Sequence, residues 1–350
     1  MSDTFIDALT HSDETHVVQA TLVSAGGSSS KKIGAKMLVG ASGKLLGGVT
    51  IGGCVDAQVI EAGDALISGG GSRVLDISLD DDEAWEIGLT CGGNVEVMLR
   101  RVAPADQHDP IVVAYAAVRR ALANDRAAVV ATPIDGATSA LVLDENGTLT
   151  GTLGHAELDA EARIVAEAVF RSGSRDATIT TPKGAWRIFF DRFAPPTTVV
   201  IVGAGQIAMS LTVLARELGM QTIIVDGRER YATRDRFPLA DSIRVGMPSE
   251  IVATIPANKR LAAVLVSHDY KYELPVLRQL LRAPVGYLGM LGSKKRGVAV
   301  RDLLREEGFT DEELARIRTP IGLDLGGKSS PEVALAILAE IVAVRSGKRA

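Results

Sequence analysis

The stretch TVVIVGAGQIAMSLTVLARELGMQTIIVD, residues 198–226, decides the fold of the C-terminal part of this chain. It opens with an apolar run, passes through a glycine-rich turn into an amphipathic segment, and closes with a second apolar run and an acid. We expect a strand over 198–202, a helix from about 205 to 218, and a second strand over 221–225. This β-α-β pattern is typical of a Rossmann-type fold.

The glycine turn follows the G-x-G-x-x-A pattern and suits a bound dinucleotide. Gly203 permits the tight turn, Gly205 lets a pyrophosphate approach the backbone, and Ala208 lets helix and strand pack closely. Gln206 follows Gly205 in this turn, and Asp226 ends the second strand, where its carboxylate can accept a hydrogen bond from a ribose 2′-hydroxyl. The same glycines also serve Rossmann folds with other ligands or none, so NAD(P) or another nucleotide is a candidate ligand.

Further elements on either side of this stretch complete an α/β plan. Ala194-Pro195-Pro196 cannot continue a helix or a central strand, so we expect a linker there and a separate domain over 197–350. Strands and helices alternate after it, which predicts a parallel sheet covered on both faces. The expected strands lie at 261–266 and 285–288, and the expected helices at 273–282, 294–307 and 331–345.

The region over 1–193 is predicted to be β-rich and mixed α/β, with a break near 104 if it forms two subdomains. No internal repeat is visible in its sequence. Its expected strands lie within 16–53 and at 73–78, 94–102, 127–132, 138–143 and 186–193, and its expected helices at 55–67, 110–123 and 157–171.

Composition limits the class of partner. The 350 residues are 46% hydrophobic and 23% charged, and the formal net charge is −5. An acidic balance argues against nucleic acid as the main partner. No apolar run approaches the roughly 20 residues that span a bilayer, and the polar start does not resemble a signal peptide. We therefore expect no membrane association and a cytoplasmic location.

Both cysteines of the chain are flanked by paired glycines, in IGGCVDAQV (51–59) and LTCGGNVEV (89–97). Cys54 precedes an amphipathic segment, so we expect it in a first helical turn, where the helix dipole lowers a thiol pKa. Glycines leave room for a bulky group beside the sulfur, and thiolates bind soft metals or carry transferable sulfur. The alternative is that each thiol is a small buried hydrophobe. The two motifs comprise Gly52, Gly53 and Cys54, and Cys91, Gly92 and Gly93.

Basic segments add candidate phosphate sites. GGSSSKKIGAKMLV (26–39) has a Gly/Ser loop with lysines, including Lys36, and a hairpin turn is its alternative. Ser293 begins a helix in GSKKR, where free N–H groups suit a phosphate, although an ordinary capped helix has the same pattern. The arginines of DGRERYATRDRF (226–237) fit either an anionic ligand or a solvated charge run.

Taken together, these stretches resemble the XdhC/CoxI family of accessory proteins for xanthine dehydrogenase and related molybdenum hydroxylases. The resemblance covers most of the chain and rests on the order of GAKMLV, GGCVDAQV, LTCGGNVEV, VVIVGAGQIA, DGRERYATRDRFP, SHDYKYELPVL, GYLGMLGSKKR and PIGLDLGGKSSPEVALAILAEIVA. It implies a chaperone that binds the molybdenum cofactor, works with a cysteine desulfurase during sulfuration, delivers the cofactor to a hydroxylase, and self-associates.

The resemblance assigns the molybdenum contact to Cys54 and Cys91. Gln206 stands where family members often have histidine, which removes imidazole acid–base chemistry from that position. Two other classes stay open: an NAD(P)-dependent oxidoreductase that uses Asp226 with His268 or a tyrosine, and a docking scaffold with an empty Rossmann site. The predicted cofactor-binding set is Cys54, Cys91, Gly52, Gly53, Gly92, Gly93, Gly203, Gly205, Gln206, Asp226, Lys36 and Ser293.

Overall fold

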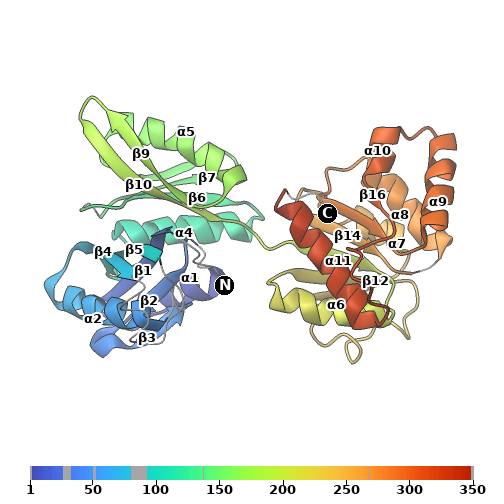
Figure 1. The fold of residues 1–350 in the computed structure, drawn as a ribbon, viewed down its shortest axis with the longest axis horizontal. Helices are drawn as coiled ribbons and strands as arrows, with labels where there is room; N and C mark the ends of the chain where they lie inside the picture. Colours follow the sequence, from blue (N-terminus) through green and yellow to red (C-terminus); the bar gives the residue numbers. More distant parts are fainter. Residues whose placement is uncertain are drawn as a thin grey trace. The chain divides into compact units, whose positions relative to one another are not determined.

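The chain folds into two compact units that meet in sequence at Pro195 and Pro196 (Figure 1). The computed structural model describes residues 2–26, 33–49, 53–79, 93–136, 138–267 and 269–347. The first unit contains two antiparallel sheets with helices, and the second contains one parallel six-stranded sheet. This arrangement confirms the predicted fold class, a mixed α/β N-terminal region followed by a Rossmann-type sheet.

The first half of the N-terminal unit is built on one antiparallel sheet, called sheet A, with strand order β3-β2-β1-β5-β4. Helix α1 was not expected from the sequence, whereas the other elements lie close to their expected positions. In chain order the elements are α1 (Ser2–Thr10), β1 (Val17–Ala25), β2 (Lys36–Val39), β3 (Leu45–Gly48), α2 (Gly53–Gly69), β4 (Ser72–Leu79) and β5 (Gly93–Val102).

The second half is built on a second antiparallel sheet, called sheet B, with strand order β8-β7-β6-β10-β9. The sequence did not indicate β8 and β9, which are short or polar. The elements are α4 (Pro110–Ala123), β6 (Ala128–Pro133), β7 (Ala140–Asp144), β8 (Leu149–Thr152), α5 (Ala156–Ser172), β9 (Arg175–Thr181) and β10 (Gly184–Phe193).

The two halves have the same topology, a repeat that the sequence does not display. Among the described α-helices and strands, each half runs helix, three strands, helix and two strands, and each sheet places its strands in the same relative order. A glycine with positive φ ends the third strand in the first half and precedes that strand's last residue in the second: Gly48 at +92° and Gly151 at +83°. A Cβ on either would lie 2.2 Å from a carbonyl oxygen of the neighbouring strand, so both positions require glycine.

The two sheets face each other across an inner layer, and one helix covers each outer face (Figure 1). Alternate residues of β1 divide between these layers, since strand side chains alternate in direction. Val18, Ala20 and Leu22 pack in the core under α2, whereas Val17 and Val23 belong to inner-layer clusters. Helix α5 covers sheet B through a separate core, and α1 and α4 fill part of the inner layer.

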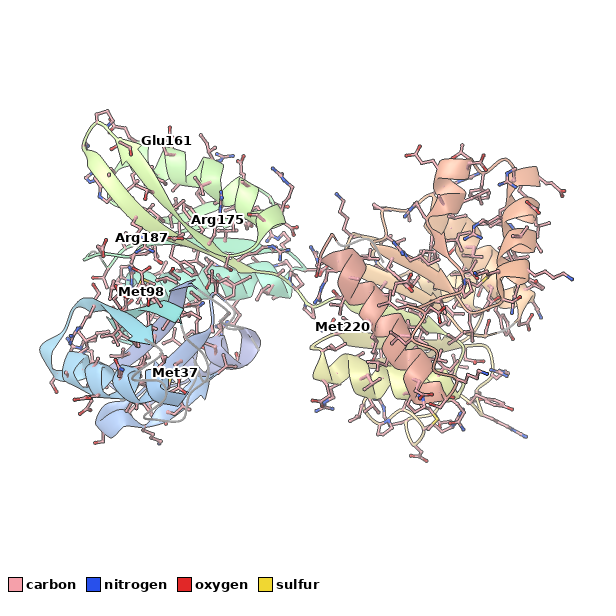
Figure 2. All side chains as sticks on the ribbon, in the orientation of Figure 1. Met37, Met98, Glu161, Arg175, Arg187 and Met220 are labelled. Atoms are coloured by element: carbon pink, nitrogen blue, oxygen red, sulfur yellow. The ribbon has the colours of Figure 1, made fainter. Side chains whose placement is uncertain are left out.

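Sheet-to-sheet contact is direct where no helix intervenes. Met98 of β5 packs against Phe189 of β10 in one apolar cluster. Beside it, Arg187 of β10 forms a two-bond ion pair with Glu96 of β5, at 2.7 and 2.6 Å. Figure 2 shows Met98 and Arg187 in the region between the two sheets. These contacts join the repeats into one unit.

The C-terminal unit is a six-stranded parallel sheet, called sheet C, with strand order β13-β12-β11-β14-β15-β16. This order, 3-2-1-4-5-6 in chain sequence, is that of dinucleotide-binding Rossmann folds. The strands are β11 (Thr198–Val202), β12 (Gln221–Asp226), β13 (Ser242–Val245), β14 (Leu261–Leu265), β15 (Tyr287–Met290) and β16 (Ile317–Arg318). Short polar strands β13 and β16 were missed by the sequence analysis.

Helices cover both faces of sheet C, each over its own apolar cluster. The buried Glu340 of α11 also ties that helix to the sheet: it accepts hydrogen bonds from Tyr287 Oη at 2.5 Å, Gly322 N at 2.8 Å and Arg318 Nη1 at 3.0 Å. The helices are α6 (Gln206–Glu217), α7 (Pro248–Ala253), α8 (Tyr270–Leu281), α9 (Lys294–Glu306), α10 (Asp311–Ala315) and α11 (Ser330–Arg345). In the described part of the chain, no helix has both the length and the apolar character to cross a bilayer.

Candidate functional site

The candidate site of the N-terminal unit lies at one edge of sheet A. Strand pairing brings three strand boundaries to this edge: Ala25 opposite Val95, Leu79 opposite Gly93, and Met37 opposite Gly48. Two backbone hydrogen bonds close it, Gly26 N to Asn94 O and Val49 N to Lys36 O, both 2.8 Å. The connections that carry the Gly/Ser/Lys loop, the GGC motif and the CGG motif therefore all begin or end here.

The cysteine motifs fall mostly beyond the described residues. Gly53 begins α2 and Cys54 is its second residue, which places Cys54 in a first helical turn as expected. The Cys54 side chain, Gly52, Cys91 and Gly92 lie outside the described part, and Gly93 begins β5. Among described side chains no group of three or more His, Cys, Asp or Glu is placed to hold a metal. The predicted metal contact of Cys54 and Cys91 stays a prediction.

Lys36 is a buried residue at the start of β2. Its ammonium pairs with the carboxylate of Asp191 on β10, donates to Gly34 O at 3.1 Å, and lies 5.3 Å from the ring centroid of Phe193. Asp191 Oδ1 also accepts from Ser174 Oγ at 3.0 Å. The pair therefore links sheet A to sheet B through the inner layer. A cofactor that binds Lys36 would have to compete with Asp191.

The glycine turn of the C-terminal unit has the geometry that its sequence motif requires. Gly203 has a φ of +113°, and a Cβ there would lie 2.8 Å from the backbone of Ser267, so the turn lies tightly against the end of β14. Gly205 caps α6 without a side-chain hydrogen bond, and a Cβ on it would meet nothing within 4 Å. Gln206 is the first helical residue. The turn can accept a pyrophosphate at the start of α6.

Asp226 is buried and already hydrogen-bonded. Its Oδ2 accepts from Ala204 N at 2.7 Å, and Arg228 donates from its backbone N and from Nε to Oδ1, both at 2.9 Å, and from Nη2 to Oδ2 at 2.8 Å. Burial acts to raise the pKa of Asp226, but the hydrogen bonds from Arg228 and Ala204 outweigh it and hold the pKa below its usual value. The ribose contact expected from the sequence requires Arg228 to move.

Two other arginines of 226–237 stabilise this loop rather than face solvent freely. Arg234 Nη1 donates to Ala240 O at 2.5 Å, and Arg236 Nη1 donates to Tyr231 O at 2.6 Å and to Ala204 O at 3.0 Å. The Arg228 guanidinium stacks over the Tyr231 ring at 4.2 Å. The loop is thus fixed against the glycine turn by its own side chains.

Ser293 lies at the same carboxyl edge of sheet C, as the N-cap of α9. Its hydroxyl accepts a hydrogen bond from Arg296 N at 3.2 Å, as in an ordinary capped helix. Arg296 Nη2 in turn donates to the fully buried Glu273 at 2.5 Å. His268, a candidate proton-transfer residue of the oxidoreductase alternative, lies outside the described residues.

Sequence reasoning missed the partners of these residues. Asp191 sits in the run RIFFDRF, and a lone acid among aromatic residues signals a buried, paired carboxylate. Arg100 lies fully buried in β5. The sequence does not indicate this burial, because the segment around Arg100 has the pattern of a half-exposed strand. These residues are far apart in sequence, so only folding reveals their contacts.

The fold and site define a two-unit protein, in which a Rossmann-type domain follows a two-sheet unit whose strand ends flank the two cysteine motifs in sequence. The model of the XdhC Rossmann domain matches residues 199–341, and the model of the XdhC and CoxI family matches residues 11–78. The chain belongs to the XdhC/CoxI family, as the sequence motifs indicated.

Named relatives extend over nearly the whole chain. The chain is 28% identical to a protein of Bacillus subtilis (strain 168) named as a probable xanthine dehydrogenase subunit, over 98% of this chain and 97% of the relative. It is 27% identical to the molybdenum cofactor insertion chaperone PaoD of Escherichia coli (strain K12), over 94% of this chain and 83% of PaoD. A crystal structure of a xanthine dehydrogenase from Bacillus halodurans has the same fold, with a TM-score of 0.76, 22% identity and coverage of 99% and 96% of the two chains.

Proposed function

We propose that this chain is an accessory protein of a molybdenum hydroxylase, which carries the molybdenum cofactor as cargo and passes it to that enzyme. The names of two relatives support this role, since one is called a molybdenum cofactor insertion chaperone and the other is called part of a xanthine dehydrogenase. In this proposal Cys54 and Cys91 contact the molybdenum centre, a cysteine desulfurase supplies the terminal sulfur, and the exchange takes place in the cytoplasm.

The observation that carries the proposal is the convergence of three connections at one edge of sheet A. Pairing of Leu79 with Gly93 and of Met37 with Gly48 brings the flanks of both cysteine motifs to that edge. The start of α2 adds free N–H groups beside Cys54, which favour a thiolate. Thiolate sulfur suits a soft metal such as molybdenum in the cargo, so the donor set fits.

The sequence between β1 and β2 adds basic residues for the pterin phosphate. The segment that joins β1 to β2 contains Lys31 and Lys32, and a phosphate is held by lysine charge and loop N–H groups. Lys36, the third lysine, is already paired with Asp191. We therefore propose that the cargo phosphate lies nearer Lys31 and Lys32, and that Lys36 acts by keeping the two sheets together.

We further propose that the Rossmann unit can hold a nucleotide through Gly203, Gly205, Gln206 and Ser293. The open space beside Gly205 supports a pyrophosphate there, as does its lack of a side-chain cap. The closed pair of Asp226 and Arg228 argues against an ordinary ribose contact. An NAD(P)-dependent oxidoreductase is thus a weaker proposal than a cofactor carrier.

The decisive experiment measures what the full chain retains when it is purified from a host that makes the molybdenum cofactor. We expect molybdenum by elemental analysis and a pterin by its fluorescence, with both reduced at least tenfold in Cys54→Ala and in the double variant with Cys91→Ala. Glu157→Ala is the matched control, because Glu157 is the second residue of α5, as Cys54 is of α2.

Three results would contradict the proposal. Unchanged retention in both cysteine variants would remove the thiols from the site. Tightly bound nicotinamide nucleotide without pterin would favour the oxidoreductase. Hydroxylase activation by the chain with neither molybdenum nor pterin bound would favour a docking scaffold. Co-purification with tagged hydroxylase and with tagged cysteine desulfurase tests the two partners separately.

A further inference from the structure

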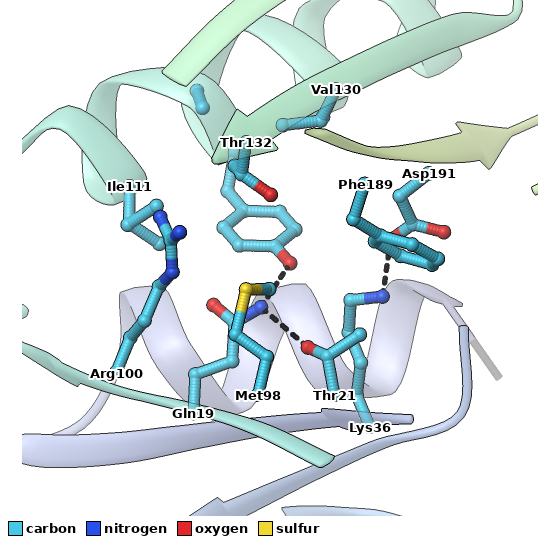
Figure 3. Close-up of a pocket in the computed structure, with 12 residues that line it drawn as sticks. Gln19, Thr21, Lys36, Met98, Arg100, Ile111, Val130, Thr132, Phe189 and Asp191 are labelled. Atoms are coloured by element: carbon cyan, nitrogen blue, oxygen red, sulfur yellow. Dashed lines mark hydrogen bonds and ion pairs between the residues drawn. The ribbon is translucent and has the colours of Figure 1, made fainter. Parts of the chain in front are cut away.

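A polar cavity lies in the inner layer of the N-terminal unit, between sheet A and sheet B (Figure 3). The side chains that line it come from both sheets and from α4. About 10 Å³ of the cavity is open to the centre of a water-sized particle, so the cavity has room for about one particle of that size. Its polar lining includes Gln19, Thr21, Lys36, Arg100, Tyr115 and Asp191.

Arg100 brings an uncompensated positive charge to this cavity. It is 1% exposed, and its Nη2 donates to Pro133 O of β6. Its Nε and Nη1 have no hydrogen-bond partner among the described residues, and none of the ion pairs formed there includes it. Burial lowers the pKa of Arg100 to about 10, so the guanidinium is still charged at neutral pH.

The other charges around the cavity do not balance Arg100. Lys36 and Asp191 pair with each other and contribute no net charge. Burial raises the pKa of Tyr115, so its phenol is neutral and cannot supply a negative charge. The described lining therefore has a net charge of about +1, and a buried unpaired charge is costly unless a counter-charge accompanies it.

Gln19 is the cross-strand neighbour of Arg100 and reaches the same cavity. Its amide nitrogen Nε2 donates to Tyr115 Oη at 2.9 Å and to Thr21 Oγ1 at 3.1 Å. Its carbonyl oxygen Oε1 is buried without a partner and lies on the side of Arg100 (Figure 3). Rotation of the amide by 180° keeps both hydrogen bonds, with the hydroxyls as donors, and turns the NH₂ group toward the cavity.

With the amide so turned, every unpartnered group around the cavity is an N–H donor: Nε and Nη1 of Arg100 and Nε2 of Gln19. We propose that this cavity binds one small monovalent anion of the halide class, with chloride as the physiological occupant. The anion would complete the contact between the two repeats, since Gln19 and Arg100 belong to sheet A and Arg100 also bonds to sheet B.

The test is the halide dependence of stability for the full chain at constant ionic strength, with chloride replaced stepwise by gluconate, which is too large for the cavity. We expect the melting temperature of the wild type to rise by about 3–6 °C with chloride or bromide and then to saturate. Arg100→Met should abolish this rise. Arg163→Met, on the exposed surface of α5, is the control that should preserve it.

Crystals of the wild type grown with bromide keep the test independent of how well Arg100→Met folds. An anomalous peak beside the Arg100 guanidinium, together with the solution shift, supports the proposal. A water-sized peak without anomalous signal, or a bromide peak without any halide-dependent stabilisation, overturns it, because the cavity would then hold water or bind halide only at crystal concentrations.

Discussion

Arg228 closes over Asp226 at the carboxyl edge of the Rossmann sheet. The guanidinium donates two hydrogen bonds to the carboxylate, from Nε at 2.9 Å and from Nη2 at 2.8 Å. Asp226 is only 2% exposed, whereas 47% of the Arg228 side chain is exposed. The acid that a ribose would approach is thus covered by a side chain that has room to move outward.

Removal of this cover should open the ribose position. In Arg228→Ala the carboxylate of Asp226 loses its side-chain donors, so we expect NADH to bind about tenfold more tightly, the equivalent of one charged hydrogen bond. Titration of NADH fluorescence measures the affinity. Arg230→Ala removes a charge of the same exposed loop and is the control. Equal affinities in all three proteins would mean that no ribose reaches Asp226.

The two glycines of the turn should differ in how much stability they contribute. Gly203→Ala forces a side chain to within 2.8 Å of the Ser267 backbone at a φ of +113°, so it should destabilise the C-terminal unit by about 2 kcal/mol or more. Gly205→Ala meets no atom within 4 Å and should change stability by less than about 0.5 kcal/mol. Urea denaturation followed by circular dichroism measures both, and equal losses would contradict the assignment.

The buried pair of Lys36 and Asp191 should behave as a structural link. Lys36→Met leaves the carboxylate of Asp191 buried without its cation, which should cost about 3 kcal/mol. Adding Asp191→Leu should recover most of this loss, because no buried charge then remains. If the double variant also regains cofactor retention, Lys36 does not touch the cargo. Loss of retention in a stable double variant would instead give Lys36 a direct contact.

The pair of Glu96 and Arg187 should make the N-terminal unit sensitive to acid. Hydrogen bonds from Arg187 lower the pKa of Glu96 below its usual value despite burial. A carboxyl group whose pKa is lowered by folding contributes its full stabilisation of the folded state when the pH is above the unfolded-state pKa. That contribution is lost as the pH falls through the folded-state pKa.

We therefore expect the wild type to exceed Glu96→Gln in stability by about 1 kcal/mol at pH 7. The difference should shrink below the ordinary carboxyl pKa of 4.5. Denaturation midpoints from pH 3 to pH 7 test this. Glu167→Gln, on the exposed pair with Arg163, should give a difference near zero throughout.

Local sequence patterns predicted several elements of both units well. The strand Thr198–Val202 and helix α4 (Pro110–Ala123) have the expected limits, because a short apolar run or a proline at the first helical position sets them directly. Helix α8 begins three residues before the expected start, since Asp269 caps it by accepting from Lys271 N at 2.9 Å. Strand β13 was missed because its half-exposed residues lack an apolar run.

Pairwise relations in the candidate sites were not predictable. The sequence identified Asp226 but not Arg228 as its cover, since arginines in a loop fit a ligand site and a solvated run equally well. It identified Lys36 but not Asp191, which is 155 positions away. A contact between such distant residues leaves no periodic signal in either segment.

By itself, the sequence determined the Rossmann-type fold, and it displays the proline pair Pro195-Pro196 and the two glycine-flanked cysteine motifs. These depend on local backbone freedom, on the missing N–H of proline and on the spacing of apolar residues. Only the tertiary structure decided the repeated pair of sheets and the polar layer of Gln19 and Arg100 between them. Such a layer forms where side chains from distant strands are enclosed together, and their charges must then be balanced within that space.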